Sequence, residues 1–240
     1  MGGHNVLLVL ANPEPASFCH ALAEAAAGAL RTDGHDVTIS DLFAQGFNPV
    51  AGRHDFLTVA DPERFHYQSE QAKAARENAF SSEITAEQAK VAAADILVFV
   101  FPLWWGSPPA ILKGWLERVL AYGFAYVDGC RFDTGLLRGR RAMIGVTTGG
   151  TVERFSPQGV YGPIEGVLYP VRRLALEYMG YDVEEPFVAY AAPRVSDEER
   201  RQMLDEFAGR AVELAHRDID RYEPPCHPLD LVPRNAWKRS

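Results

Sequence analysis

The sequence predicts an α/β protein with a doubly wound, five-stranded parallel sheet and helices on both faces. Three observations lead to this fold class. Near-continuous apolar runs such as NVLLVL (residues 5–10) and DILVFVF (95–101) are typical of strands buried on both faces of a parallel sheet. Helical patterns separate these runs, as crossovers between parallel strands require. The chain has 240 residues, of which 47% are hydrophobic and 23% charged, enough for one large domain.

The first strand, residues 5–10, leads into an alanine-rich helix over about 18–31, for which Ser17 is a suitable N-terminal cap. An Asp-Gly pair ends this helix. Residues 35–40 alternate polar and apolar side chains, which indicates a second, more exposed strand. Residues 41–82 show no strong period. They are too long for an ordinary connection, so we expect a functional segment or an excursion packed on the surface.

The second half of the chain continues the alternation. A helix over about 82–94 leads into the third strand at 95–101, and Ser107 and Pro108 then favour the start of a mostly buried helix. The remaining elements are a fourth strand at 141–147, a helix at 168–179, a fifth strand at 182–188 and a helix at 196–216 with a capping box. This series suits the flavodoxin-like strand order 2-1-3-4-5, which binds ligands at the carboxyl ends of the strands.

Composition argues against several classes of function. The net charge of -8 and the pI near 5.4 provide no basic stripe for nucleic acid or an anionic membrane. No stretch reaches roughly 18 apolar residues and the N-terminus lacks signal-peptide features, so we expect no membrane insertion. Three scattered cysteines without CxxC spacing indicate reduced thiols in a cytoplasmic protein. The histidines form no metal-binding motif, so we expect no metal.

The last predicted helix ends at residue 216, so we expect the chain to divide there into two segments. Residues 1–216 should form the catalytic domain, and the proline-rich residues 217–240 should extend along a surface or pack on a partner subunit.

Three loops should meet at the carboxyl ends of the strands. Residues 11–17 offer backbone amides, the Ser17 hydroxyl and a helix N-terminus, which suit a phosphate. Trp104 and Trp105 follow the third strand and offer flat surfaces for a planar ring. The TTGG sequence at 147–150 lets backbone N–H groups approach a polar ring edge closely. Because GxGxxG and GxxxxGK[ST] are absent from the sequence, these loops predict a flavin site rather than a Rossmann dinucleotide site or a P-loop.

The segment FPLWWGSPPAILKGWLERVLAYGFAY, together with TTGG, resembles the NAD(P)H:quinone oxidoreductase family, the DT-diaphorase type of flavoprotein. The resemblance covers roughly residues 4–215 and includes ANPEPASF, DLFAQGFNP and SPQGVYG. It implies a flavodoxin-like, cytoplasmic homodimer with tightly held FAD. It also implies two-electron reduction of quinones in a ping-pong cycle, with NAD(P)H and quinone using one pocket that is completed across the dimer interface.

The resemblance further implies roles for particular residues. Ser17, Phe18 and Cys19 would hold the phosphate region of the flavin, and Arg200 would lie near the adenine end. The other flavin contacts would be Asn12, His66, Pro102, Leu103, Trp104, Trp105, Thr147, Thr148, Gly149, Gly150 and Phe155. The substrate pocket would be lined by Trp105, Gly106, Tyr126, Tyr161 and Phe187. Because Phe155 has no donor, we expect the catalytic groups to be the amides of Gly149 and Gly150, with one neutral hydrogen bond from Tyr161.

The chain departs from the family pattern at several of these positions. The family often has histidine at Asn12 and glutamine at His66, and it has tyrosine and histidine where this chain has Phe155 and Tyr161. Gly106 replaces a bulky residue and should open the pocket. Three alternatives therefore stay open: an FMN-dependent azo-, nitro- or flavin reductase of the same fold, a regulatory flavoprotein subunit of a potassium efflux system, and an electron carrier without an NAD(P)H site. The long excursion and the tail favour a stand-alone enzyme.

Overall fold

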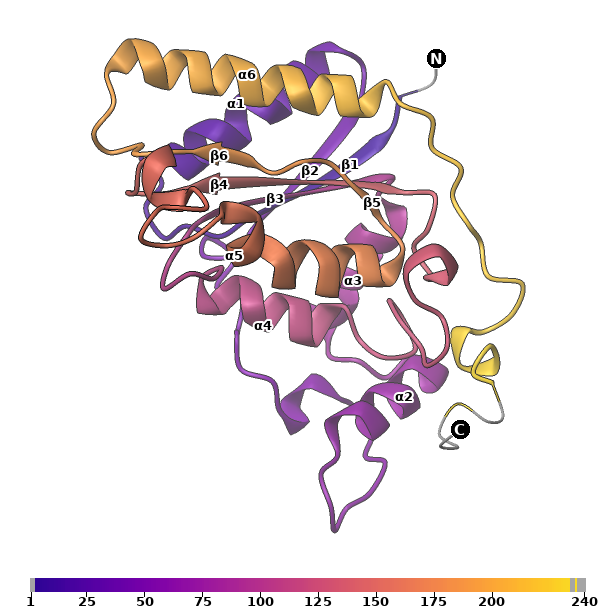
Figure 1. Cartoon of the computed structure of the whole chain (residues 1–240). Coiled ribbons are helices and arrows are strands. Elements are labelled where there is room, and N and C mark those ends of the chain that lie inside the picture. The colour runs from indigo at the N-terminus through magenta and orange to yellow at the C-terminus, as the bar shows by residue number, and fades with distance from the viewer. Residues whose placement is uncertain (1–2, 234–235, 237–240) are drawn as a thin grey trace.

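The computed structural model describes residues 3–233 and 236 and places a parallel sheet between two layers of helices (Figure 1). The strand order is β2-β1-β3-β4-β5, and β6 also pairs with β4. All these pairs are parallel. The strands are β1 (Asn5–Leu10), β2 (Asp36–Asp41), β3 (Ile96–Pro102), β4 (Arg141–Thr147), β5 (Asp182–Val183) and β6 (Phe187–Ala189). The predicted flavodoxin-like fold and strand order are confirmed.

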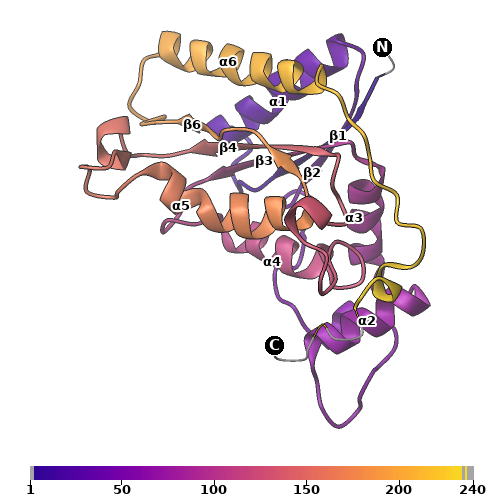
Figure 2. The same ribbon diagram turned by 45° about the vertical axis from the view of Figure 1, so that its right-hand side comes forward.

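Helices cover both faces of the sheet, as Figures 1 and 2 show. One face is covered by α1 (Phe18–Thr32) and α6 (Asp197–Ala215), and the other by α3 (Ser82–Ala93), α4 (Ala110–Val119) and α5 (Ile164–Val171). Successive side chains of a strand point to opposite faces, so the apolar run of β1 serves both cores. Leu8 packs with the α1 and α6 side chains, whereas Leu7 packs with those of α4 and α5.

The predicted fifth strand, residues 182–188, is wrong as a single element. The structure divides it into β5, which pairs at Arg141↔Asp182, and β6, which pairs at Gly145↔Phe187. Pro186 lies between them, and proline has no N–H to donate to a ladder. The sheet edge is therefore interrupted where the sequence suggested continuous pairing.

The helix predicted at 168–179 begins earlier and is not uniform. It starts with α5 at Ile164 and continues as a π-helix over Arg172–Glu177, just after Pro170. A proline inside a helix removes one i→i−4 hydrogen bond, and widened π turns are one way to accommodate that loss. By contrast, α6 begins and ends as predicted, with Ser196 and Glu199 forming the capping box.

The excursion between β2 and α3 contains structure that the sequence did not predict. It holds a short 3₁₀ turn, η1 (Arg53–Asp55), and the helix α2 (Tyr67–Glu77). Arg118 of α4 anchors the segment: its side chain is 1% exposed, and its Nη2 lies 2.6 Å from Oδ1 of Asp55. A buried charge needs such a partner, so this ion pair fixes the excursion to the α/β domain.

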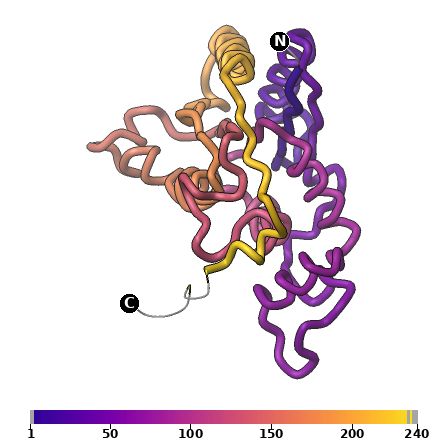
Figure 3. The backbone as a smooth tube through the Cα atoms, turned by 90° about the vertical axis from the view of Figure 1, so that its right-hand side faces the viewer, coloured from indigo at the N-terminus to yellow at the C-terminus, as the bar shows by residue number. Residues whose placement is uncertain are grey.

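The tail runs back from α6 to the excursion along one side of the molecule (Figure 3). The N–H of Asp220 donates to the Gly139 carbonyl at 3.1 Å, and Arg76 of α2 pairs with Asp230 at 2.7 Å. These contacts lie within one chain, so packing of the tail on a partner stays a prediction. Residues 1–2, 234–235 and 237–240 of the two expected segments lie outside the described residues. Within the described part of the chain, every helix is too short or too polar to cross a membrane.

Candidate active site

The loops after β1, β3 and β4 meet at the carboxyl ends of the strands, as predicted, and line a cavity of about 500 Å³. Most of the expected flavin contacts lie there. The lining residues are Asn12, Ala16, Ser17, Phe18, Cys19, Ala21, Pro102, Leu103, Trp104, Thr147, Thr148, Gly149, Ala192, Pro193 and Arg200. The structure thus brings together residues that are up to 188 positions apart in the sequence, from Asn12 to Arg200.

The N-terminus of α1 forms one end of this cavity. Ser17 caps the helix and accepts a hydrogen bond from the His20 N–H at 3.4 Å. The first amides of a helix have no intrahelical partner, so those of Phe18 and Cys19 are available to an anion. The Cys19 sulfur lies 3.3 Å from Oγ1 of Thr147, and burial raises the pKa of its thiol. Cys19 is therefore a neutral packing residue at the end of the cavity formed by the α1 N-terminus.

A tight turn at residues 104–107 places the two tryptophans. The N–H of Trp104 donates to the Ser107 carbonyl and that of Ser107 to the Trp104 carbonyl, both at 3.0 Å. Trp105 and Gly106 between them have φ values of 51° and 67°, the pattern of a type I′ turn. A Cβ at Gly106 would meet nothing within 4 Å, so this φ value, rather than a lack of space in the pocket, favours glycine. The predicted helix start at Ser107 and Pro108 is wrong: Pro109 is the N-cap and the helix begins at Ala110.

A second cavity, of about 590 Å³, opens on the other side of the 147–150 loop. Leu103, Thr148 and Gly149 line both cavities. The remaining lining residues of the second cavity are Trp105, Gly106, Gly150, Arg154, Phe155, Tyr161, Val167 and Arg194. One wall therefore serves two adjoining spaces, one that ends at a helix N-terminus and one that has an aromatic rim.

Hydrogen bonds fix the shared wall. The Gly150 N–H donates to Oγ1 of Thr148 at 3.0 Å, whereas the Gly149 N–H has no partner within the described part of the chain. A Cβ at Gly150 would lie 2.7 Å from the Phe155 ring, so only glycine fits there without a shift of that ring. Two amides were expected to meet a ring edge. Within the described residues, the Gly149 N–H remains available for this, whereas the Gly150 N–H is bound to Thr148.

Three expected site residues lie outside these cavities. His66 is the N-cap of α2, where its Nδ1 accepts from the Ser69 N–H at 3.3 Å. Tyr126 packs against Tyr122 and Tyr178 beside a separate apolar pocket under α4. Phe187 is 3% exposed and its ring lies 5.1 Å from that of Phe207 beneath α6. The structure of one chain does not bring these three to the site.

Sequence reasoning missed two charged residues of the second cavity, Arg154 and Arg194. Arg194 follows β6, so it too lies beyond the carboxyl end of a strand. That position was the available signal, because residues just beyond the carboxyl end of a parallel strand lie at the same edge of the sheet as the other three loops. Arg154 belongs to a 3₁₀ turn, η3 (Val152–Phe155), for which the sequence has no distinctive pattern.

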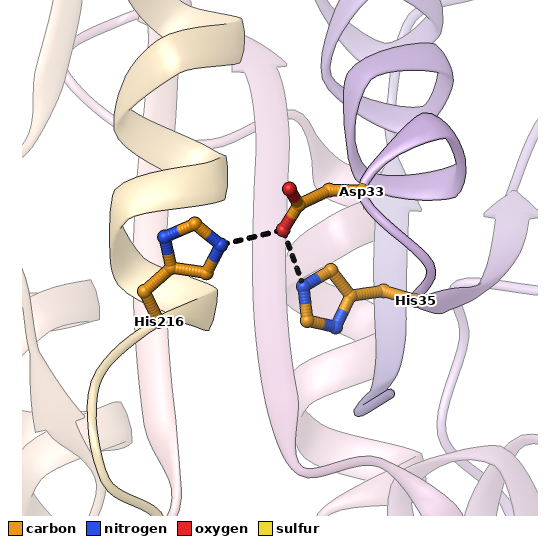
Figure 4. Close-up of side chains that lie close together, drawn as sticks. All are labelled: Asp33, His35 and His216. Carbon is orange, nitrogen blue, oxygen red and sulfur yellow. Dashed lines mark hydrogen bonds and ion pairs between the residues drawn. The ribbon is translucent and has the colours of Figure 1, made fainter. Parts of the chain in front are cut away.

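Asp33, His35 and His216 cluster at the opposite edge of the sheet, near the amino end of β2 (Figure 4). Oδ2 of Asp33 lies 3.0 Å from Nε2 of His35 and 2.6 Å from Nε2 of His216. The His4 N–H donates to Nδ1 of His35, so the proton of neutral His35 is on Nε2. A metal ion would need that atom unprotonated. The geometry therefore suits a hydrogen-bonded carboxylate better than a metal site.

Comparisons with known proteins agree with this architecture. A family model described as flavodoxin-like fold matches residues 4–212. The chain is 42% identical over 228 residues to ribosyldihydronicotinamide dehydrogenase [quinone] of Pongo abelii, covering 94% of this chain and 96% of that protein. It is 38% identical over 232 residues to NAD(P)H dehydrogenase [quinone] 1 of Rattus norvegicus, covering 96% and 84%.

A solved structure gives the same answer. A candidate quinone reductase from Klebsiella pneumoniae superposes with a TM-score of 0.85 at 36% identity, covering 90% of this chain and 87% of that one. The resemblance expected from the sequence is therefore confirmed, and the chain belongs to the flavodoxin-like family of NAD(P)H:quinone oxidoreductases.

Proposed function

We propose that this enzyme holds FAD in the first cavity and reduces quinones by two electrons in the second, with hydride from NAD(P)H. The observation that carries the proposal is the shared wall of Leu103, Thr148 and Gly149 between the two cavities. A flavin ring lying along that wall would present one edge to the loop and one face to the aromatic rim. NAD(P)H and quinone would then use the same open space in turn, as a ping-pong cycle requires.

The residues of the first cavity fit a flavin dinucleotide. The α1 N-terminus suits the phosphates because its free amides and helix dipole favour negative charge. Arg200 lines the far end, where its Nη1 donates to the Ala192 carbonyl at 3.1 Å and its Nη2 pairs with Asp197 at 2.6 Å. A guanidinium held in this way offers a flat surface and spare donors to an adenine. When bound, the flavin would supply hydride acceptance from the nicotinamide and hydride donation to the quinone.

Gly149 and Tyr161 would stabilise the negative charge that hydride transfer places on the ring edge. The Gly149 N–H has no partner among the described residues, and Tyr161 lines the cavity with 53% of its surface exposed. Phe155, whose ring centroid lies 5.0 Å from that of Tyr161, offers no donor. One preorganised donor aimed at such a charge is typically worth roughly 2.7–4 kcal/mol. The Gly150 N–H would add to this stabilisation only if its hydrogen bond to Thr148 were broken.

A second copy of the chain would complete the site. Of the three expected site residues that lie outside this chain's own cavities, Phe187 is buried, whereas His66 and Tyr126 are not, which supports a role for these two in the partner's site. The excursion also exposes Val50, Leu57 and Val59, apolar surface suited to a dimer contact. We further propose a cytoplasmic location, which the free cysteines Cys19, Cys130 and Cys226 support. Sedimentation of an active monomer at working concentration would contradict the dimer.

Identification of the cofactor tests the proposal directly. The purified protein should show a flavin absorbance spectrum and release FAD on denaturation, and initial rates with NAD(P)H and quinone should follow ping-pong kinetics. Release of FMN alone would overturn FAD binding. A flavin-loaded enzyme that reduces no quinone would overturn the proposed acceptor, and an azo dye or free flavin assayed in parallel would identify the alternative reductases.

The relatives' names point to a second candidate for the reductant. The protein of Pongo abelii, at 42% identity, is named for ribosyldihydronicotinamide, a riboside that carries no phosphate. Dihydronicotinamide riboside should therefore be assayed beside NADH and NADPH. The reductant with the highest kcat/KM identifies the electron donor of this chain.

A further inference from the structure

We infer that the second cavity selects substrates that carry a negatively charged group next to their reactive ring, and that Arg154 and Arg194 recognise this group. The inference rests on the proposed function, because it concerns the substrates of the same cavity. Both arginines line the 590 Å³ space together with Trp105, Gly106 and Tyr161. No Asp or Glu is among the residues that line it.

Arg194 is held in place by the wall of the cavity. Its loop is joined to the 147–150 loop by backbone hydrogen bonds, from the Ala191 N–H to the Gly150 carbonyl at 2.8 Å and from the Ala192 N–H to the Thr148 carbonyl at 3.1 Å. The Arg194 side chain then donates from Nη1 to the Gly149 carbonyl. A guanidinium has five N–H donors, so this bond positions the group and leaves most donors for a ligand.

Arg154 faces the same space from a different element. It lies in η3, and its carbonyl accepts a hydrogen bond from the Tyr161 N–H at 2.9 Å. A Cβ at Gly159 would lie 2.4 Å from that carbonyl oxygen, so the loop is closed tightly. The backbone of Arg154 is thus tied to Tyr161, while its exposed side chain borders the cavity.

Neither arginine has an acidic partner among the residues that the structure describes. Across residues 3–233, no carboxylate oxygen lies within 4.0 Å of the side-chain nitrogens of Arg154 or Arg194. In contrast, Arg200 in the first cavity is paired with Asp197, and Arg118 in the core is paired with Asp55. The chain has a net charge of -8, so two unpaired cations at one cavity do not reflect a general excess of basic residues. Unpaired guanidinium groups are suited to bind phosphate, sulfonate or carboxylate.

The ligands expected in this cavity therefore share one feature: an anionic group close to a ring that stacks beside Trp105. It can come from the reductant, as the phosphate of a nicotinamide nucleotide, or from an acidic group on the acceptor. The uncharged dihydronicotinamide riboside should be a poorer donor than its 5′-phosphate for the same reason.

Two matched substrate pairs distinguish these sources. The reductants are dihydronicotinamide riboside and dihydronicotinamide mononucleotide, and the acceptors are a naphthoquinone with and without a sulfonate on its benzene ring. For each pair, the ratio of kcat/KM for the charged to the uncharged member is measured in the native protein, Arg154→Gln and Arg194→Gln. We expect each variant to lower at least one ratio by about three- to tenfold, and added salt to lower it in the native protein. Arg194→Lys keeps the charge and should retain part of the ratio.

Arg201→Gln is the matched control. Arg201 is an exposed residue of α6 that pairs with Glu198 at 2.8 Å and lines neither cavity, so its loss should leave both ratios unchanged. If Arg154→Gln and Arg194→Gln gave the same kcat/KM ratios as the native protein, the inference would be overturned, whereas the proposed quinone reduction would still stand. If the native protein reduced no quinone, the proposed function would fail instead. Calorimetry would then measure the binding of oxidised nicotinamide mononucleotide and of oxidised nicotinamide riboside. The inference requires that the native protein binds the mononucleotide more tightly, and that Arg154→Gln and Arg194→Gln lose this difference in affinity.

Discussion

Replacing Trp105 should impair turnover of aromatic acceptors without destabilising the fold. Its side chain is fully exposed, with a relative exposure of 105%, so truncation removes no buried surface. Its backbone has a φ of 51°, a left-handed conformation that costs an L-residue roughly 1–2 kcal/mol. Glycine avoids this cost but loses about 0.5–1 kcal/mol through the greater freedom of the unfolded chain. Trp105→Gly should therefore change the free energy of unfolding by only about 0 to +1.5 kcal/mol.

The effect on turnover should be much larger. A ring stacked on the indole would bury roughly 50–100 Å² of apolar surface, which at about 25 cal/mol per Å² corresponds to about 1.3–2.5 kcal/mol. We therefore expect kcat/KM for quinone to fall roughly ten- to seventyfold in Trp105→Ala and in Trp105→Gly. For a chain of this size, the stability change of Trp105→Gly should raise the melting temperature by no more than about 3–6 °C.

Trp115 provides the control within the same part of the chain. It is 0% exposed, and its ring packs edge-on against Phe99 with centroids 5.7 Å apart. Trp115→Ala should cost about 3–5 kcal/mol of stability, as expected for a buried aromatic residue. Calorimetric melting and steady-state kinetics on the flavin-loaded proteins measure both effects. If Trp105→Ala lost 3 kcal/mol or more with an unchanged KM for quinone, Trp105 would be a packing residue and the reasoning would be refuted.

Three other substitutions test the site and the fold. Tyr161→Phe should slow flavin reduction ten- to a hundredfold in stopped-flow experiments, a loss of about 1.4–2.7 kcal/mol, because the exposed Tyr161 hydroxyl contributes less than a fully preorganised donor; a rate within twofold of the parent would contradict this. Glu87→Ala leaves the buried Trp115 indole N–H without its acceptor (2.8 Å) and should cost about 1–3 kcal/mol in urea unfolding; a loss under about 0.5 kcal/mol would be inconsistent with a buried hydrogen bond. The hydrogen bond from His216 lowers the pKa of Asp33, so this carboxylate adds stability above the ordinary carboxyl pKa of about 3.9, and that stability is lost as the pH falls through the lowered value. His216→Ala should raise the Asp33 midpoint in an NMR titration, and an unmoved midpoint would rule the coupling out.

The parts of the fold that follow apolar patterns were predictable from the sequence. The runs that became β1, β3 and β4 are buried on both faces, and the capping box at Ser196 marked the start of α6. Helix α2 was missed because the residues it buries include Glu70 and Gln71, so its inner face has no apolar period. Tertiary contacts stabilise such a helix, and these contacts cannot be read from its own residues.

The candidate site was likewise predictable in part. Because carboxyl ends of parallel strands meet at one edge, the loops after β1, β3 and β4 were expected together, and the structure places them together. Arg194 was missed although it follows β6, so its place beyond the carboxyl end of a strand was open to the same reasoning. His66 and Tyr126 were assigned from the resemblance alone, and a sequence does not say from which copy of a chain a residue reaches a site.

The tail has a consequence for the order in which the protein is completed during synthesis. Its contacts with the excursion join residues very far apart: the His227 ring lies 3.2 Å from the Ala75 carbonyl, 152 positions earlier, and Asp230 pairs with Arg76, 154 positions earlier. A ribosome adds about 5–20 residues per second, so α2 leaves it roughly 8–30 s before these partners do. During that interval the nascent excursion must rely on Arg118 and the α/β domain, and protease or chaperone access to α2 should end only when the tail arrives.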